Sequence, residues 1–195
     1  MKLLKTLLAS AVAVSAMPAL AYDAGDIIVK AGIAHVAPKD DNLKLAGAGT
    51  VEVESDTQLG ITATYMVTPQ IGVEVLAATP FKHDIKLNGK KVATTKHLPP
   101  TISAQYYPMD PASKIQPYVG LGINHTFFFD EDGIVNHLGK STGLALSAGM
   151  NYDIDDKFMA NVAVWKIDID SELNEGGKDV EIDPLVFMVG AGMKF

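Results

Sequence analysis

Residues 183–195, at the end of the chain, form the pattern that most constrains the fold. Counted back from Phe195 in twos as far as Leu185, every position is apolar, whereas Lys194 and two glycines lie between these positions. A period of two is typical of a β-strand with one apolar face. Because a long exposed strand edge pairs readily with other chains, we expect a closed barrel in which this strand pairs with the first one. The apolar set is Leu185, Phe187, Val189, Ala191 and Met193.

Residues 1–21 have the features of a secretory signal peptide. Two lysines precede an apolar stretch from Leu7 to Ala16, and Ala19-Leu20-Ala21 supplies the small residues of a cleavage site. The alternative is an amino-terminal helix that stays attached. We expect an exported chain that begins near Tyr22 and forms a single domain over residues 22–195.

Composition excludes several classes of protein. Of the 195 residues, 48% are hydrophobic and 20% are charged. Beyond residue 21 there is no apolar run of the roughly 18 residues that a spanning helix needs. The net charge of −7 and the lack of arginine argue against nucleic-acid binding. The sequence has no cysteine, so it offers neither disulfides nor a thiolate site, and we expect no cofactor.

Eight alternating segments follow, joined by connections that are long after the first, third, fifth and seventh and short after the others. Short periplasmic turns and longer external loops are typical of an outer-membrane barrel with an even number of antiparallel strands. Asn88-Gly89, within one long connection, favours a small hairpin. The expected strands cover residues 26–36, 57–66, 71–78, 101–107, 114–129, 142–152, 158–169 and 183–195.

A soluble eight-stranded barrel would show the same strand count, but its second face would be strongly charged to meet water. Here that face is made of small and uncharged polar residues with isolated Lys30, Glu74 and Lys194, which favours a packed lumen. Aromatic residues favour two membrane girdles, although β-propensity alone could scatter them. One girdle would hold Tyr65, Tyr106, Tyr152, Phe158 and Phe195, and the other Phe81, Phe127, Phe129 and Trp165.

Several motifs resemble the outer membrane protein W (OmpW) family over essentially the whole mature chain. They include Ala77-Ala78-Thr79-Pro80-Phe81, His97-Leu98-Pro99-Pro100-Thr101, Gln116-Pro117-Tyr118-Val119-Gly120 and Asp183-Pro184. Leu185 departs from the family pattern, in which a Trp is common after Asp-Pro. The resemblance implies an eight-stranded outer-membrane barrel with a hydrophobic channel that releases small molecules sideways into the membrane.

Prolines give lateral release a mechanical basis. Pro80, Pro99 and Pro100 lie at the facing ends of the third and fourth strands, and proline cannot donate a ladder hydrogen bond. The barrel wall could therefore open at this seam. Alternatively, these prolines only end strands beside a loop.

Inward parity identifies the residues expected to line the lumen. The apolar ones could form the mouth of a channel, together with two loop residues. The charged ones could form a structural plug or a gate near the periplasmic half, because buried charges must be paired. The apolar set is Leu76, Ala78 and Met188 with Phe81 and Leu98, and the charged set is Lys30, Glu74 and Lys194.

Other chemistry is sparse. Four histidines fall in the external half, but their spacing matches no metal-ligand motif, and we assign no metal site. Asp130-Glu131-Asp132-Gly133 lacks the alternate oxygen ligands of a calcium loop. No catalytic triad is recognisable, so an enzyme is not expected. The histidines are His83, His97, His125 and His137.

Two functional hypotheses follow. The first is passive uptake of small hydrophobic molecules across the outer membrane of a Gram-negative bacterium. The alternative is a structural or recognition barrel whose loops bind lipopolysaccharide, phage, bacteriocins or host components. The expected partners are outer-membrane lipids, lipopolysaccharide phosphates near the lysines of residues 82–96, and the assembly machinery, which would read Phe195.

Overall fold

The computed structural model describes residues 21–39, 43–45, 49–133, 139–172 and 179–195. The expected signal peptide therefore lies outside the described residues, except for Ala21. Within the described ranges, no helix is long and apolar enough to span a membrane.

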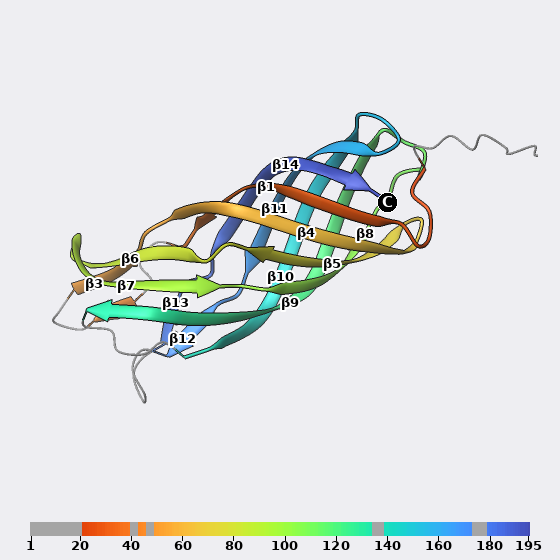
Figure 1. The fold of residues 1–195 in the computed structure, drawn as a ribbon. Coiled ribbons are helices and arrows are strands. Elements are labelled where there is room, and N and C mark those ends of the chain that lie inside the picture. The colour runs from red at the N-terminus through yellow and green to blue at the C-terminus, as the bar shows by residue number, and fades with distance from the viewer. Residues whose placement is uncertain (1–20, 40–42, 46–48, 134–138, 173–178) are drawn as a thin grey trace, which may run out of the picture.

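Eight antiparallel strands close into a barrel, as the sequence predicts (Figure 1). The last strand pairs with the first, with Ala31 opposite Ala191, so neither forms a free edge. In order around the wall, the strands are β1 (Ile27–Ala37), β4 (Asp56–Thr68), β5 (Ile71–Ala78), β8 (Thr101–Tyr106), β9 (Ile115–Gly133), β10 (Ser141–Asp153), β11 (Phe158–Ile167) and β14 (Leu185–Lys194).

The long connections carry further strands that lengthen the barrel at one end. The carboxyl-terminal part of β9 continues past β8 and pairs with β7, which forms a hairpin with β6. The turn of this hairpin is Asn88-Gly89, with φ values of 51° and 76°, as its turn chemistry predicts. The extension is thus more regular than the expected loops. It contains β2 (Leu43–Leu45), β3 (Gly49–Val53), β6 (Phe81–Leu87) and β7 (Lys90–Leu98), and β12 (Asp170–Glu172) pairs separately with β13 (Asp179–Glu181).

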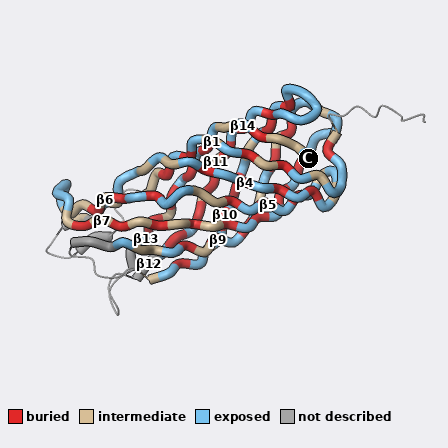
Figure 2. Tube along the Cα trace, in the orientation of Figure 1, coloured by how far each residue is buried: buried red, intermediate tan, exposed pale blue. Residues whose placement is uncertain are grey.

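Buried and exposed residues alternate along the strands (Figure 2), so one face of each strand lines the interior. The outward face of the barrel is apolar, as a lipid-facing belt requires. The aromatic residues expected beside the short turns are all exposed. They are Tyr65, Tyr106, Tyr152, Phe158 and Phe195.

The second expected girdle is wrong in two of its members. Phe81 and Trp165 are each 1% exposed and lie inside the barrel. Lys166 and Asp168 take the outward positions on this part of the chain. The strand passes out of the lipid here, so its apolar face turns from the outside to the inside.

Candidate channel interior and wall seam

A buried ion pair crosses the half of the barrel interior nearest the short turns. Lys30 on β1 and Glu74 on β5 contact each other at 2.8 Å, with side chains 0% and 1% exposed. The Thr64 hydroxyl donates to the same Glu74 carboxylate oxygen, and the Lys30 ammonium lies 4.8 Å from the centre of the Tyr118 ring. The isolated charges on the inward face therefore meet and are paired, which buried charges require.

Hydrogen bonds extend this polar layer toward the rim that carries the short turns. Asn161 donates to the Asn151 side chain at 2.7 Å, and Asn151 donates to the Tyr22 hydroxyl at 3.0 Å. Tyr22 precedes β1, and its ring packs edge-on against Tyr107 at 5.6 Å. The segment before the first strand thus folds into the barrel base and fills it.

Lys194 has the expected inward parity but lies nearer the rim than the Lys30–Glu74 pair. Its ammonium donates to the Ala21 carbonyl at 2.7 Å and lies 4.0 Å from the Asp26 carboxylate. Lys194 therefore ties the amino-terminal segment to β14.

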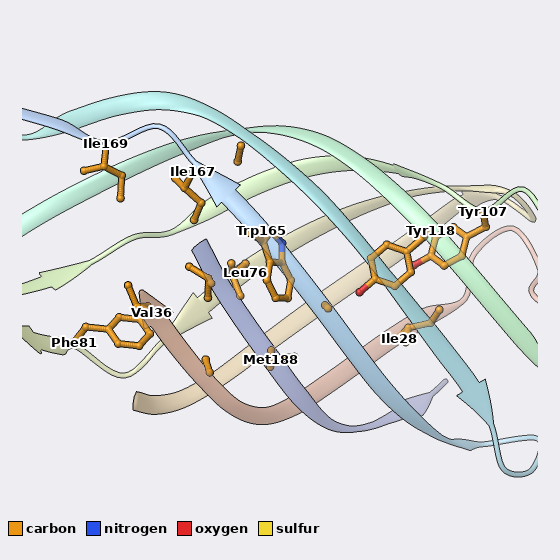
Figure 3. Close-up of a cluster of buried hydrophobic side chains, with 14 of the residues drawn as sticks. Ile28, Val36, Leu76, Phe81, Tyr107, Tyr118, Trp165, Ile167, Ile169 and Met188 are labelled. Atoms are coloured by element: carbon orange, nitrogen blue, oxygen red, sulfur yellow. The ribbon is translucent and has the colours of Figure 1, made fainter. Parts of the chain in front are cut away.

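The outer half of the interior combines an apolar cluster with buried, hydrogen-bonded polar side chains such as Thr101, Asn124 and Thr126. Leu76, Met188 and Phe81 belong to one buried cluster with Trp165, and the half-buried Ala78 packs against it. Figure 3 shows Trp165, Leu76 and Met188 between the tyrosine layer and the outer residues. The structure thus brings together four of the five residues expected at the channel mouth.

Leu98 is the exception. Strand alternation places His97 inside and Leu98 on the opposite, half-exposed face, beside its ladder partner Phe127. The expectation that Leu98 lines the interior is therefore corrected, because the stretch treated as a loop continues as strand β7 with a period of two.

The ladder between the third and fourth barrel strands is interrupted. Pairing of β5 with β8 ends at Leu76 and Thr101, and pairing resumes between β6 and β7 at Phe81 and His97. No registered pair joins residues 77–80 to residues 98–100, all of which the structure describes.

Two of the three prolines face this interruption, which we call the seam. The Pro100 carbonyl accepts from the His125 N–H on β9, and the Thr79 N–H donates to Leu59 on β4. Because the N–H and C=O groups of one residue point to the same side of an antiparallel strand, the neighbouring Pro80 and Pro99 point into the seam. Each removes one donor there, whereas Pro100 faces β9.

An apolar groove lies on the outward face beside the seam. It encloses about 640 Å³. Its walls come from β8, β9 and the residue that precedes β8. They are Pro100, Ile102, Leu121, Gly122, Ile123, His125 and Phe127.

Two histidines of the extension stack inside the barrel, above the seam. The ring centres of His83 and His97 lie 4.7 Å apart, and the rings are inclined by 15°. Burial lowers the pKa of His97 to about 3, with a smaller contribution from His83, and burial also lowers the pKa of His83.

The remaining histidines do not join this pair to form a metal site. His125 contacts Thr142, and His137 lies outside the described residues. Among the described residues, no group of three or more histidine, aspartate or glutamate side chains could hold a metal ion.

Sequence reasoning missed three features of the interior. Tyr22 was expected only as the start of the mature chain, and its position inside the barrel base was not predicted. Trp165 was expected in a girdle, although its neighbours Ile167 and Ile169 already marked the change of apolar face. The His83–His97 contact depends on a register shift between Ile85 and Lys86, which the Asn88-Gly89 turn alone does not predict.

Comparisons with known proteins agree with this architecture. The sequence model of the OmpW family matches residues 23–195. Outer membrane protein W of Escherichia coli is 42% identical over 98% of this chain and 100% of its own length, and that of Vibrio cholerae is 41% identical over 96% and 97%. The crystal structure of OprG from Pseudomonas aeruginosa superposes with a TM-score of 0.81 at 41% identity, covering 90% of this chain and 98% of that one. The chain therefore belongs to the OmpW family and is a β-barrel of the Gram-negative outer membrane.

Proposed function

We propose that this barrel is a channel for the passive uptake of small, mainly hydrophobic molecules, which leave through the seam into the membrane. The observation that carries the proposal is the arrangement of the interior. An apolar cluster in the outer half, with Leu76 and Met188, leads to a polar layer that contains the Lys30–Glu74 pair. A hydrophobic solute is stabilised against the apolar cluster. To cross the polar layer, it must displace buried, paired charges.

The seam supplies a path around that layer. It lies beside Leu76, where the ladder between β5 and β8 ends, and Pro80 and Pro99 withhold donors from its two edges. Parting the strands there breaks fewer backbone hydrogen bonds than parting any intact ladder. The apolar groove lined by Ile102 and Ile123 lies directly outside.

A reversible lock across the seam tests the proposal. Ala77 and Pro100 would be opposite each other if the β5–β8 register continued, so the Ala77→Cys/Pro100→Cys pair can bridge the two edges. The chain has no cysteine of its own, and these would be its only thiols. Entry of the lipid-activated dye N-phenylnaphthylamine into cells should fall severalfold on oxidation and recover on reduction.

A matched pair in an intact ladder is the control. Ala31→Cys/Ile61→Cys joins opposed outward positions of β1 and β4. Oxidation of this pair should leave dye entry unchanged. Equal dye entry by the oxidised and reduced seam variants would count against lateral release.

We also propose that the extension contacts lipopolysaccharide phosphates. Lys82 lies directly opposite Lys96 on the outward face. Lys96 pairs with Asp130 at 2.9 Å, whereas the Lys82 ammonium forms no ion pair within 4 Å among the described residues and interacts with Asp84 only at longer range. Lys82→Ala should weaken binding of phosphorylated lipid A more than Lys114→Ala, a change at the opposite end of the barrel. Equal binding by the two variants would argue against this contact.

A further inference from the structure

The His83–His97 pair forms an aromatic cluster inside the extension. His83 on β6 is 1% exposed and His97 on β7 is 2% exposed. The ring of Phe81 stacks on His97 at 5.4 Å, and Phe128 approaches His97 from β9 at 5.9 Å. Both imidazoles are therefore buried in a cluster of stacked and tilted aromatic rings.

Three nitrogen atoms of this pair lack protein partners. The Nδ1 atom of His83 contacts the Glu54 carbonyl, which can only accept, so Nδ1 carries the proton and Nε2 is left as an acceptor. His83 Nε2 and both ring nitrogens of His97 have no hydrogen-bond partner among the described residues. Because buried polar atoms are nearly always paired, this set calls for a further partner.

Charge restricts what that partner can be. Burial keeps both imidazoles neutral at neutral pH, and the opposing effect of the Asp56 carboxylate on β4 is weaker than burial at each ring. A charged group placed between them would lose hydration without an opposite charge. A neutral hydroxyl carries one donor and can accept, so it complements an imidazole N–H and an imidazole lone pair.

We propose that His83 and His97 bind the hydroxyl group of a small alcohol or phenol whose apolar body lies in the outer half of the interior. This inference rests on the proposed function and narrows its solutes from hydrophobic molecules in general to hydroxylated ones. His97 lies two residues before Pro99, and Phe81 belongs to the same buried cluster as Trp165. The body of a solute held by the pair therefore lies beside the seam.

Paired probes test the site directly. The binding of n-octanol and n-octane is measured on the protein in lipid nanodiscs, through the fluorescence of Trp165, the single tryptophan. His97→Phe keeps a ring in place and removes no protein hydrogen bond at that side chain. Relative to the wild type, it should weaken n-octanol binding about five- to tenfold and leave n-octane binding unchanged. Comparing the two proteins cancels partition of the probes into the lipid.

A second readout and a control keep the result interpretable. In the wild type, n-octanol should shift the ring-nitrogen resonances of His97, a signal that needs no variant. His35→Phe makes the same chemical change at an exposed histidine that bonds Thr57, and it should bind both probes as the wild type does. An unchanged His97 resonance, or equal weakening of both probes in His97→Phe, would overturn the proposal.

Failure of the site and failure of the proposed function remain distinguishable. Binding can be measured on the oxidised Ala77→Cys/Pro100→Cys protein, in which the seam is closed. Selective n-octanol binding there supports the site even if dye entry proves insensitive to the lock. Conversely, a lock that stops dye entry supports lateral release even if neither probe touches His97.

Discussion

The two halves of the barrel interior differ in the side chains that they bury. Toward the periplasm, Lys30, Glu74, Asn151 and Tyr22 belong to a chain of ion-pair and hydrogen-bond contacts. Toward the outside, Trp165, Leu76 and Met188 form an apolar cluster, and the rings of His83 and His97 stack on each other. Both halves contain buried polar atoms without a hydrogen-bond partner among the described residues, such as Glu74 Oε1 in the first and the His97 ring nitrogens in the second. The difference therefore lies in charge: under the proposed function, the charged layer acts as a seal and the apolar and aromatic part as a receptacle.

The largest effect is expected when the Lys30–Glu74 ion pair is broken. Lys30→Met leaves the buried Glu74 carboxylate without its counter-charge and should lower the free energy of unfolding by about 3–5 kcal/mol. Unfolding by urea in lipid vesicles, followed by Trp165 fluorescence, measures the loss. The double variant Lys30→Met/Glu74→Leu should recover most of it, since no charge is then stranded. A single variant as stable as the wild type would mean that water already reaches Glu74.

Low pH should destabilise the part of the interior around His97. The pKa of His97 is about 3 in the folded protein and near 6.5 in an unfolded chain, so the unfolded state binds more protons between these values. Stability is therefore complete above pH 6.5 and decreases as the pH falls, by about 2 kcal/mol at pH 5. The protection factors of the β6 and β7 amides, which correct for the slower intrinsic exchange at low pH, should be lower at pH 5 than at pH 7.

His97→Phe supplies the control for this acid effect. The variant lacks the titrating ring and should lose most of the pH dependence, while His83 and Asp56 retain a smaller part. An equal loss of amide protection in the variant and the wild type would locate the sensitive group elsewhere.

Features that repeat along one strand could be predicted from the sequence. The period of two predicted the strands, the closure of β14 on β1 and the inward parity of Lys30 and Glu74, because each needs only local alternation. Contacts between residues of different strands were predicted only where both residues lie on the inward face, as Lys30 and Glu74 do.

Features that depend on register or on a change of environment were missed. Leu98 was misplaced because the polar stretch of residues 81–98 was treated as a loop. Trp165 was misplaced because a strand that leaves the lipid exchanges its apolar face. Tyr22 enters the barrel from outside any strand, and no periodic signal marks such a residue.

A smaller effect is expected where the amino-terminal segment joins the seal. Tyr22→Phe keeps the ring against Tyr107 but removes the hydroxyl that accepts from Asn151, which should cost about 1 kcal/mol of stability. Dye entry should not change, because solutes leave above this layer. Tyr152→Phe alters an exposed tyrosine at the same end and should affect neither quantity. Faster dye entry in Tyr22→Phe would indicate a path through the periplasmic end.

The smallest expected effect separates the two adjacent prolines. Pro99→Ala restores a donor that points into the seam, opposite Ala78 in the continued β5–β8 register. One additional hydrogen bond of about 1 kcal/mol should slow dye entry about fivefold. Pro100→Ala restores a donor toward β9 instead, where that edge is already held, and dye entry should be unchanged.

The direction of the missing N–H group therefore decides the outcome, because the two changes are the same in chemistry and adjacent in sequence. Amide exchange provides the structural check: the new amide at position 99 should be protected, together with Ala78. If both variants slowed dye entry equally, chain stiffness around the prolines, rather than the broken ladder, would govern the wall. Protection of the amide at position 99 without slower dye entry would indicate that solutes leave the barrel somewhere other than the seam.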